Sequence, residues 1–391
     1  MSNAINKANK VISQPKLSKQ RQKGVALITA LIITSVVVSL ATLIIYRQQI
    51  QIRLSSNIST LEQNYQYAYS MEDFAGTILK RSLEDQPNFV SLNDDWYSES
   101  GLVLPITGGV MTGKLFDLQA RINLNSLNRP ITRTNVPATQ TDTSTSPPPN
   151  QAANVIVTDI ASVTKTRLRD LISIIDEQQE MGPPENFVTI LRDWIDKDQN
   201  NGQSFNDTDE FAYGNGAETP FYQSQEPAYF SANTELISPT ELRLIKDMKE
   251  ELYPAIANET ATLPTLSGTT ATQTPINVNT ASENVLRALG FTPDAVTNIM
   301  EVREENPFES LDAFTSLAVV ENVLITEDNP NGEVNPLDLA VTSQYFLLEG
   351  KVEINNTRLF VNSILWRNTN GQVSVIMRDF SNPQTINKAI N

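Results

Sequence analysis

Cysteine and histidine are both absent from the 391 residues of this chain. Their absence excludes disulfides, thiol nucleophiles, histidine-containing catalytic triads and the usual ligand sets of zinc, copper and haem. The sequence also contains no Gly-x-Ser-x-Gly, Gly-rich phosphate loop or metalloprotease motif. We therefore expect a protein that is not an enzyme. The remaining enzymatic alternative is a pair of carboxylates of the glycosidase type, which a sequence does not place across a cleft.

Basic residues are scarce outside the N-terminus. The formal net charge is −16, yet residues 1–24 carry six basic side chains and no acidic one, so the rest of the chain has a net charge of −22. A body of this charge repels nucleic acid and anionic lipid headgroups and attracts cations. We therefore expect no nucleic-acid partner.

One long apolar run follows the basic N-terminus. The 22 residues from Val25 to Tyr46 include no charged residue, no Gly and no Pro. As a helix this run would be about 33 Å long, enough to cross a hydrocarbon core of about 30 Å. A cleaved secretory signal peptide is the alternative, but its apolar part is usually only about 7–15 residues long. We predict a single membrane-spanning segment at 25–46, with its basic side in the cytoplasm.

The junction before this run resembles the processing site of type IV prepilins. Lys23 and Gly24 end the charged leader, and Val25-Ala26-Leu27-Ile28 begins the apolar helix. The resemblance implies that a prepilin peptidase cuts after Gly24 and methylates the amino group of Val25. An ordinary membrane anchor with a chance glycine is the alternative.

The fifth residue after this junction is Thr29. Pilins and most pseudopilins carry Glu at this position, where its charge meets the amino terminus of the subunit above. A carboxylate without such a partner is costly in lipid. A non-acidic residue there is therefore expected in a subunit with no neighbour above it, at the tip of a filament, although a protein unrelated to pilins would equally lack the acid.

Periodicity predicts the remaining architecture. Apolar residues continue at spacings of three and four after the apolar run, which predicts an amphipathic helix over 47–83. Alternating residues predict strands at 114–123, 344–354, 357–367 and 372–380. Helical patterns fill the sequence between the first strand and the others, after a Ser/Thr/Pro-rich tract with too few apolar residues to fold. The predicted parts are a leader (1–24), a membrane helix (25–46), a first soluble part (47–127), a flexible loop (128–154), an inserted helical domain (155–335) and C-terminal strands (336–391).

Three motifs in this order resemble the large minor pseudopilins of bacterial type II secretion, the general secretion pathway protein K family. They are the Gly24 junction followed by Tyr67-Ala68-Tyr69-Ser70-Met71-Glu72, the segment Leu191–Asp198, and Ile276–Ser282. Some members carry a cysteine pair in the helical domain, which this chain lacks. The resemblance implies an α+β fold, in which a pilin-like N-terminal helix packs on a small antiparallel sheet and a large all-α domain is inserted between strands.

The same resemblance implies a function. Members cap the tip of the type II secretion pseudopilus, initiate its assembly and support export of folded periplasmic proteins. The implied partners are minor pseudopilins of the I and J types, the prepilin peptidase, the inner-membrane secretion platform and secreted substrates. The body would be periplasmic, held by one pass through the inner membrane. The alternative is a membrane-anchored periplasmic calcium-binding protein or a competence pilin for DNA uptake.

An acidic loop is the candidate metal site. Asp196, Asp198 and Asn200 alternate, and Asp207 and Asp209 follow. Glycine at the seventh position and Asp at the twelfth differ from an EF-hand, so a solvated acidic turn remains the alternative. The lack of His and Cys favours a hard cation over zinc. The family resemblance implies a structural Ca²⁺ bound by these five residues.

Residues 276–317 resemble a helix-hairpin-helix, a module that often binds DNA. The DNA-binding form needs a Gly-rich hairpin with basic neighbours, whereas here Gly290 is the hairpin's one glycine and acidic residues predominate. We expect a protein-packing module in which a capping box starting at Thr280 begins the first helix.

Overall fold

The computed structural model describes residues 23–128, 132–135, 155–158, 160–180, 182–183, 186–200, 216–264, 274–326, 329 and 332–382. The chain divides into two compact units, residues 1–62 and residues 63–391. Helix α1 (Lys23–Asp85) is continuous, beginning in the first unit and ending in the second. The predicted helices at 25–46 and 47–83 are therefore parts of one element.

A five-stranded antiparallel sheet forms the centre of the second unit. The order of its strands is β1-β2-β9-β10-β11. β2 therefore pairs with β9, which lies more than 200 residues later in the chain. The strands are β1 (Leu102–Ile106), β2 (Gly109–Asp117), β9 (Tyr345–Ile354), β10 (Thr357–Arg367) and β11 (Val373–Asp379). The three predicted C-terminal strands are confirmed as β9, β10 and β11.

The strand predicted at 114–123 is interrupted after Asp117, and beyond it only Ile122 and Asn123 belong to a strand, which is short and separate. The carboxylate of Asp117 accepts a hydrogen bond from the backbone N–H of Gln119 at 2.8 Å and caps a 3₁₀ helix, η1 (Leu118–Ala120). An aspartate that captures the backbone two residues ahead competes with the strand ladder. The alternating pattern continues through 118–123, but the chain leaves the sheet at Asp117.

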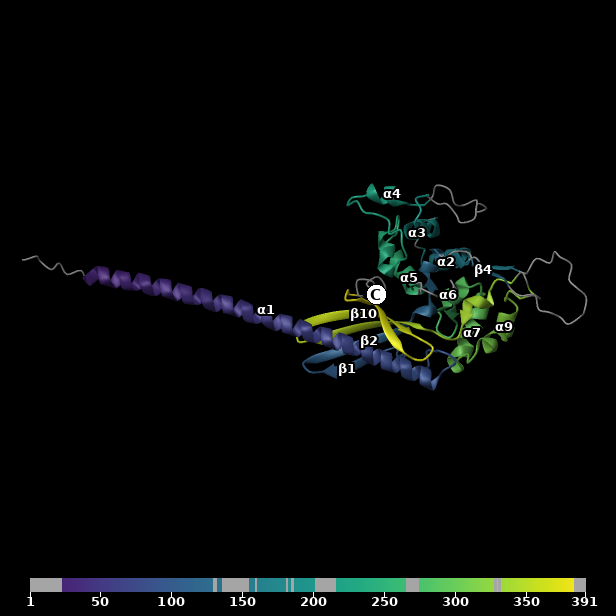
Figure 1. The fold of residues 1–391 in the computed structure, drawn as a ribbon, viewed down its shortest axis with the longest axis horizontal. Helices are drawn as coiled ribbons and strands as arrows, with labels where there is room; N and C mark the ends of the chain where they lie inside the picture. Colours follow the sequence, from purple (N-terminus) through teal and green to yellow (C-terminus); the bar gives the residue numbers. More distant parts are fainter. Residues whose placement is uncertain are drawn as a thin grey trace, which may run out of the picture. The chain divides into compact units, whose positions relative to one another are not determined.

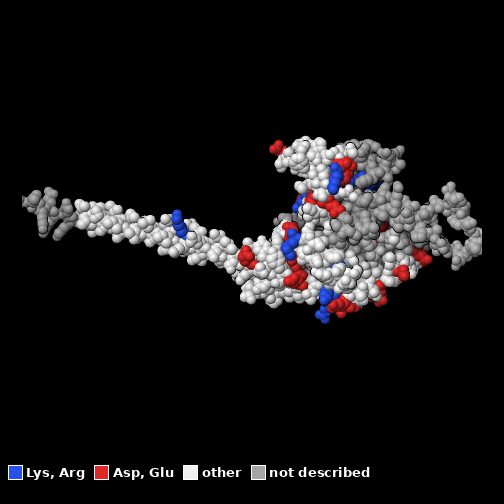
Figure 2. Space-filling view, in the orientation of Figure 1, with Lys and Arg blue, Asp and Glu red and all other residues white. Residues whose placement is uncertain are grey.

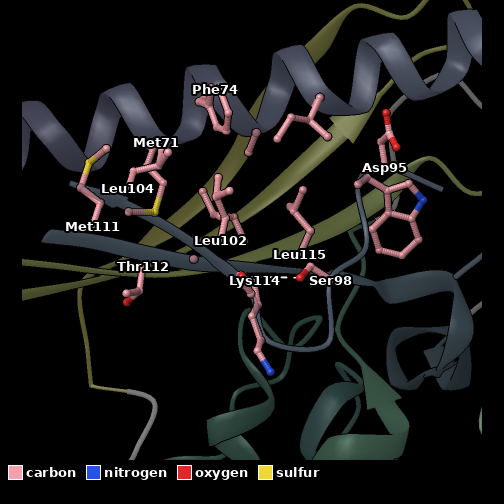
Figure 3. Close-up of a pocket in the computed structure, with 16 residues that line it drawn as sticks. Met71, Phe74, Asp95, Ser98, Leu102, Leu104, Met111, Thr112, Lys114 and Leu115 are labelled. Atoms are coloured by element: carbon pink, nitrogen blue, oxygen red, sulfur yellow. Dashed lines mark hydrogen bonds between the residues drawn. The ribbon is translucent and has the colours of Figure 1, made fainter. Parts of the chain in front are cut away.

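The C-terminal part of α1 packs on one face of the sheet, as Figure 1 shows. Gly350 on β9 permits the close approach, because a Cβ there would lie 2.5 Å from Met71 Sδ on the helix. Figure 3 shows Met71 and Phe74 facing Leu102 and Leu104 of β1 across an apolar cavity of about 80 Å³.

A buried ion pair fixes the helix to the sheet. Glu72 on α1 is 5% exposed and accepts hydrogen bonds from Arg378 on β11, with Nε to Oε1 at 2.6 Å. Ser363 on β10 donates to the same carboxylate, and the guanidinium lies 4.7 Å from the ring of Tyr69. This bidentate geometry explains a polar residue on the otherwise apolar face of α1.

The segment between β2 and β9 is mainly helical and packs as one large core. Its longer helices are α2 (Ile160–Gln179), α3 (Phe187–Ile195), α5 (Leu252–Glu259) and α7 (Pro293–Glu305). Its shorter elements are η2 (Leu124–Asn128), α4 (Thr219–Gln223), η3 (Pro239–Leu244), α6 (Glu283–Ala288), α8 (Leu311–Thr315), α9 (Ala318–Glu321) and η4 (Pro336–Asp338). The predicted α+β class, a long N-terminal helix on a small antiparallel sheet with a helical insertion between strands, is confirmed.

Three short strand pairs accompany these helices. β3 (Ile122–Asn123) pairs with β6 (Thr260–Ala261), and β7 (Ile276–Asn277) pairs with β8 (Leu339–Ala340), both in parallel. β4 (Thr132–Asn135) and β5 (Val155–Thr158) form an antiparallel pair. Residues 136–154, most of the predicted loop at 128–154, lie outside the described residues.

Candidate functional site

Helix α1 begins with an uncharged stretch that carries the predicted membrane segment. It is the one helix of the described chain that is long and apolar enough to cross a bilayer, and Val25–Tyr46 shows no charge in Figure 2. Thr29 donates its hydroxyl to the carbonyl of Ala26 at 3.0 Å, so its polar group is satisfied within the helix. Residues 1–22 of the predicted leader lie outside the described residues, whereas the junction Gly24–Val25 falls in the first turn of α1.

Carboxylates gather at the C-terminal end of α3. Oxygens of Asp196, Asp198 and Glu218 lie within 4.8 Å of one another. Asp193, in the last turn of α3, accepts a hydrogen bond from the backbone N–H of Ala217 at 2.9 Å. This bond fixes the segment that carries Glu218. The cluster therefore joins the end of α3 to the start of α4.

The buried members of this cluster carry raised pKa values. Burial, followed by the charges of Asp198 and Asp193, raises the pKa of Asp196 to about 7. Burial, followed by the charges of the three aspartates, raises the pKa of Glu218 to about 8. Both carboxylates are shielded from solvent, and the neighbouring acids outweigh the one nearby cation, Arg192, whose Nε lies 3.8 Å from Asp196 Oδ2. This environment disfavours their ionised forms.

The donor set fits a hard cation. Oδ1 of Asp196 and both carboxylate oxygens of Glu218 are buried and accept no hydrogen bond from the residues that the structure describes. Buried acceptors without donors are rare in folded proteins unless water or an ion satisfies them. Oxygen ligands suit calcium or magnesium rather than zinc or copper.

The structure brings together part of the predicted metal set. Asp196 and Asp198 are in the cluster, and the backbone N–H of Asn200 donates to Asp198 Oδ1 at 2.8 Å. Asp207 and Asp209 lie outside the described residues. The sequence prediction missed Glu218, because a twelve-residue loop pattern starting at Asp196 ends at 207. A search for any acid at the far end of the loop, just before the start of α4, would have found it.

A second polar cluster joins the sheet to the inserted segment. The carboxylate of Asp117, at the end of β2, accepts hydrogen bonds from Ser343 and Thr280 at 2.6 Å and from Asn277 at 3.1 Å. Asn277 also donates to the backbone carbonyl of Val90. Burial raises the pKa of Asp117, and these hydrogen bonds oppose the rise.

This cluster corrects one prediction and explains a motif. Thr280 does not cap α6; Ser282 does, accepting from the backbone N–H of Val285 at 3.1 Å, because the Thr280 hydroxyl is used by Asp117. The Ile276–Ser282 motif therefore lies beside Asp117, where the chain leaves the sheet, and beside Ser343, just before the chain returns to it. Its polar residues hold the inserted segment to the sheet.

The helix-hairpin-helix has the predicted turn. Gly290 follows α6 with φ of +110°, a conformation that favours glycine, and Thr292 caps α7. Its two nearby basic residues are engaged internally: Arg303 donates to the carbonyl of Val278 at 2.7 Å, and Arg287 pairs with Glu177. Both guanidinium groups are therefore engaged within the protein, which supports the packing role over DNA binding.

Comparisons with known proteins agree with this architecture. Models of the family described as type II secretion system (T2SS), protein K, match residues 120–265 and 276–331, slightly more than half of the chain. The chain is similar to the type II secretion system protein K of Aeromonas hydrophila, with 26% identity over 92% of this chain and 98% of that protein. It is 28% identical to the protein of that description from Pseudomonas aeruginosa, over 92% of this chain and 93% of the relative.

One solved structure shows the same fold. It is the crystal structure of the GspK-GspI-GspJ complex from the type 2 secretion system of enterotoxigenic Escherichia coli, matched with a TM-score of 0.60 at 22% identity. The match covers 84% of this chain and 99% of that chain.

Proposed function

The chain belongs to the type II secretion system protein K family and is a minor pseudopilin of that system, and from this we propose that it caps the tip of the pseudopilus and initiates its assembly. The body is periplasmic, and the helix beginning at Val25 anchors it in the inner membrane with the basic leader in the cytoplasm. In this position the protein supports export of folded periplasmic proteins across the outer membrane without catalysing a reaction.

The observation that carries this proposal is the position of the inserted segment. Residues 118–344 leave the sheet at the end of β2 and return at β9, so a body larger than the sheet itself is attached to one end of it. A subunit inside a thin filament is covered by neighbours above and below. A body of this size is accommodated at the end of a filament and obstructs the next subunit anywhere else.

Thr29 supports the same position. Its hydroxyl is satisfied by the helix, so it needs no partner in lipid or within a helical bundle. A glutamate there would need the amino terminus of a subunit above to neutralise it. A capping subunit has no such neighbour.

The proposed partners are minor pseudopilins of the I and J types, in a tip complex like that of the structurally similar GspK-GspI-GspJ assembly. The prepilin peptidase would remove the leader after Gly24 and methylate Val25. The inner-membrane platform would add further subunits beneath the tip, and secreted proteins are candidate contacts of its exposed end.

Co-purification tests the tip complex. When the full chain is expressed with its I- and J-type pseudopilins, we expect all three in one complex at equal stoichiometry by native mass spectrometry. In immuno-electron microscopy of the pseudopilus, we expect a tag on this chain to label one end. A tagged major pseudopilin is the control and should label the whole shaft. Label repeated along the shaft, or a chain that purifies alone, would contradict the proposal.

We also propose that Asp196, Asp198 and Glu218 bind a structural Ca²⁺, with Asn200, Asp207 and Asp209 as further candidate ligands. The support is the set of buried carboxylate oxygens without donors. The ion would neutralise the mutual repulsion of the acids and fix the connection between α3 and α4. It would take no part in chemistry.

Calcium removal is expected to lower the thermal stability of the full chain. An ion present at 100 times its Kd stabilises the folded state by about 2.7 kcal/mol, so the melting temperature should differ by several degrees between calcium and chelator. Glu218→Gln should abolish most of this difference, whereas Glu304→Gln, at an exposed position of α7, should preserve it. Coincident melting curves with calcium and with chelator would show that the cluster is a solvated acidic turn.

A further inference from the structure

A cleft lies between the inserted segment and the face of the sheet that α1 does not cover. Its volume is about 160 Å³. One wall is formed by β9, β10 and β11, and the other by α5, β6 and the start of η3. The label of α5 lies next to the sheet in Figure 1. The apolar part of its lining includes Phe116, Leu347, Ile364, Met377 and Ala257.

Two opposite charges face this cleft without meeting. Arg121 follows η1, and Glu349 lies on β9 between Lys114 of β2 and Asn362 of β10. Each charge favours the ionised form of the other. Yet among the described residues neither group makes an ion pair within 4.0 Å or a hydrogen bond; the guanidinium only lies 5.8 Å from the ring of Phe116.

Burial acts on both groups. Both side chains are half-buried, and this partial burial lowers the pKa of Arg121 and raises the pKa of Glu349. Oδ1 of Asn362, beside Glu349, is buried and accepts no hydrogen bond from any described residue, although its Nδ2 donates to the carbonyl of Ser381. The cleft therefore holds a separated cation and anion on an apolar background.

Ligand sites in proteins are typically apolar clefts with a few convergent polar groups, often where two substructures meet. We propose that this cleft binds an α-amino acid with an apolar side chain, its carboxylate on Arg121, its ammonium on Glu349 and its side chain against the apolar wall. A ligand with both charges satisfies both groups at once. A ligand with one charge leaves the opposite, half-buried protein charge unpaired, and the small volume restricts the ligand to about one residue.

L-leucine is a suitable probe, measured by ligand-observed NMR and calorimetry on the full chain in detergent. We expect saturable binding that weakens at least about tenfold in Arg121→Gln and in Glu349→Gln, since a hydrogen bond to a charged group contributes roughly 1.5–3 kcal/mol. Lys351→Gln is the matched control, because Lys351 is on the same strand and pairs with Glu353 outside the cleft. It should leave the affinity unchanged.

Analogues with a single charge keep the proposal falsifiable even where a variant is less stable. 4-Methylpentanoate lacks the amino group and should bind Glu349→Gln better than the original protein. 3-Methylbutylamine lacks the carboxylate and should bind Arg121→Gln better. The proposal would be overturned if leucine fails to saturate the protein, or if neither cleft variant changes the affinity for leucine. It would also be overturned if each analogue binds its variant no better than the original protein. Binding of peptides but not of leucine would also overturn it.

Discussion

Gly24→Ala is expected to leave the complete 24-residue leader on the protein. The peptidase of the resembled family cuts after glycine, and a Cβ at the residue before the cut obstructs the approach of an enzyme to the backbone. The retained leader keeps six basic side chains at the cytoplasmic end of α1. These charges would have to cross the bilayer for the helix to leave the membrane, which is strongly unfavourable. We therefore expect both tip assembly and secretion to fall to the level of a strain without the protein.

Intact-mass measurement decides the outcome directly. The original protein should begin at Val25 with the mass of one added methyl group, and Gly24→Ala should retain Met1 or Ser2. Gly76→Ala is a matched control in the same helix, where a Cβ would only make an ordinary contact of 3.5 Å with Val373. Leader removal from Gly24→Ala, or an uncut original protein, would contradict the prediction and with it the tip proposal.

Elements with a strong local pattern were predictable from the sequence. The strands β9, β10 and β11 alternate apolar and polar residues and are separated by Asn-rich turns, and the structure has them within one or two residues of the predicted bounds. The start of α7 was equally clear, since Thr292 caps it and Pro293 occupies its first position. In each case the signal lies within a few residues of the element itself.

Features that depend on distant residues were not predictable in this way. The short parallel strands β3 and β7 are only two residues long, and their partners β6 and β8 follow much later in the chain. Thr280 has the sequence context of a helix cap, yet the carboxylate of Asp117, 163 residues earlier, accepts its hydrogen bond. Glu218 joins the acidic cluster through the return of the chain after the loop. A periodicity carries no information on such tertiary partners.

The polar cluster at Asp117 leads to the largest expected change in stability. Asp117→Ala removes the acceptor of three side-chain donors and of one backbone N–H, all in a buried site. Hydrogen bonds to a charged group contribute about 1.5–3 kcal/mol each, and disruption of a buried network is among the few causes of losses above about 4 kcal/mol. Removal of a buried charge offsets part of this loss, as the raised pKa indicates. We expect the free energy of unfolding to fall by about 3 kcal/mol or more.

The Ser343→Ala variant provides the comparison, because it removes one donor and keeps the carboxylate. Its expected cost is about 1 kcal/mol. Because Asp117 belongs to the sheet and Thr280 to the inserted segment, Asp117→Ala and Thr280→Val should show a coupling energy of at least about 0.5 kcal/mol in a double-mutant cycle by chemical denaturation. Strictly additive effects, or a loss in Asp117→Ala no larger than that in Ser343→Ala, would show that the Asp117 cluster does not hold the inserted segment to the sheet. A substantial coupling would mean that the carboxylate of Asp117 helps to fix the bulky body proposed to mark the filament tip to the sheet.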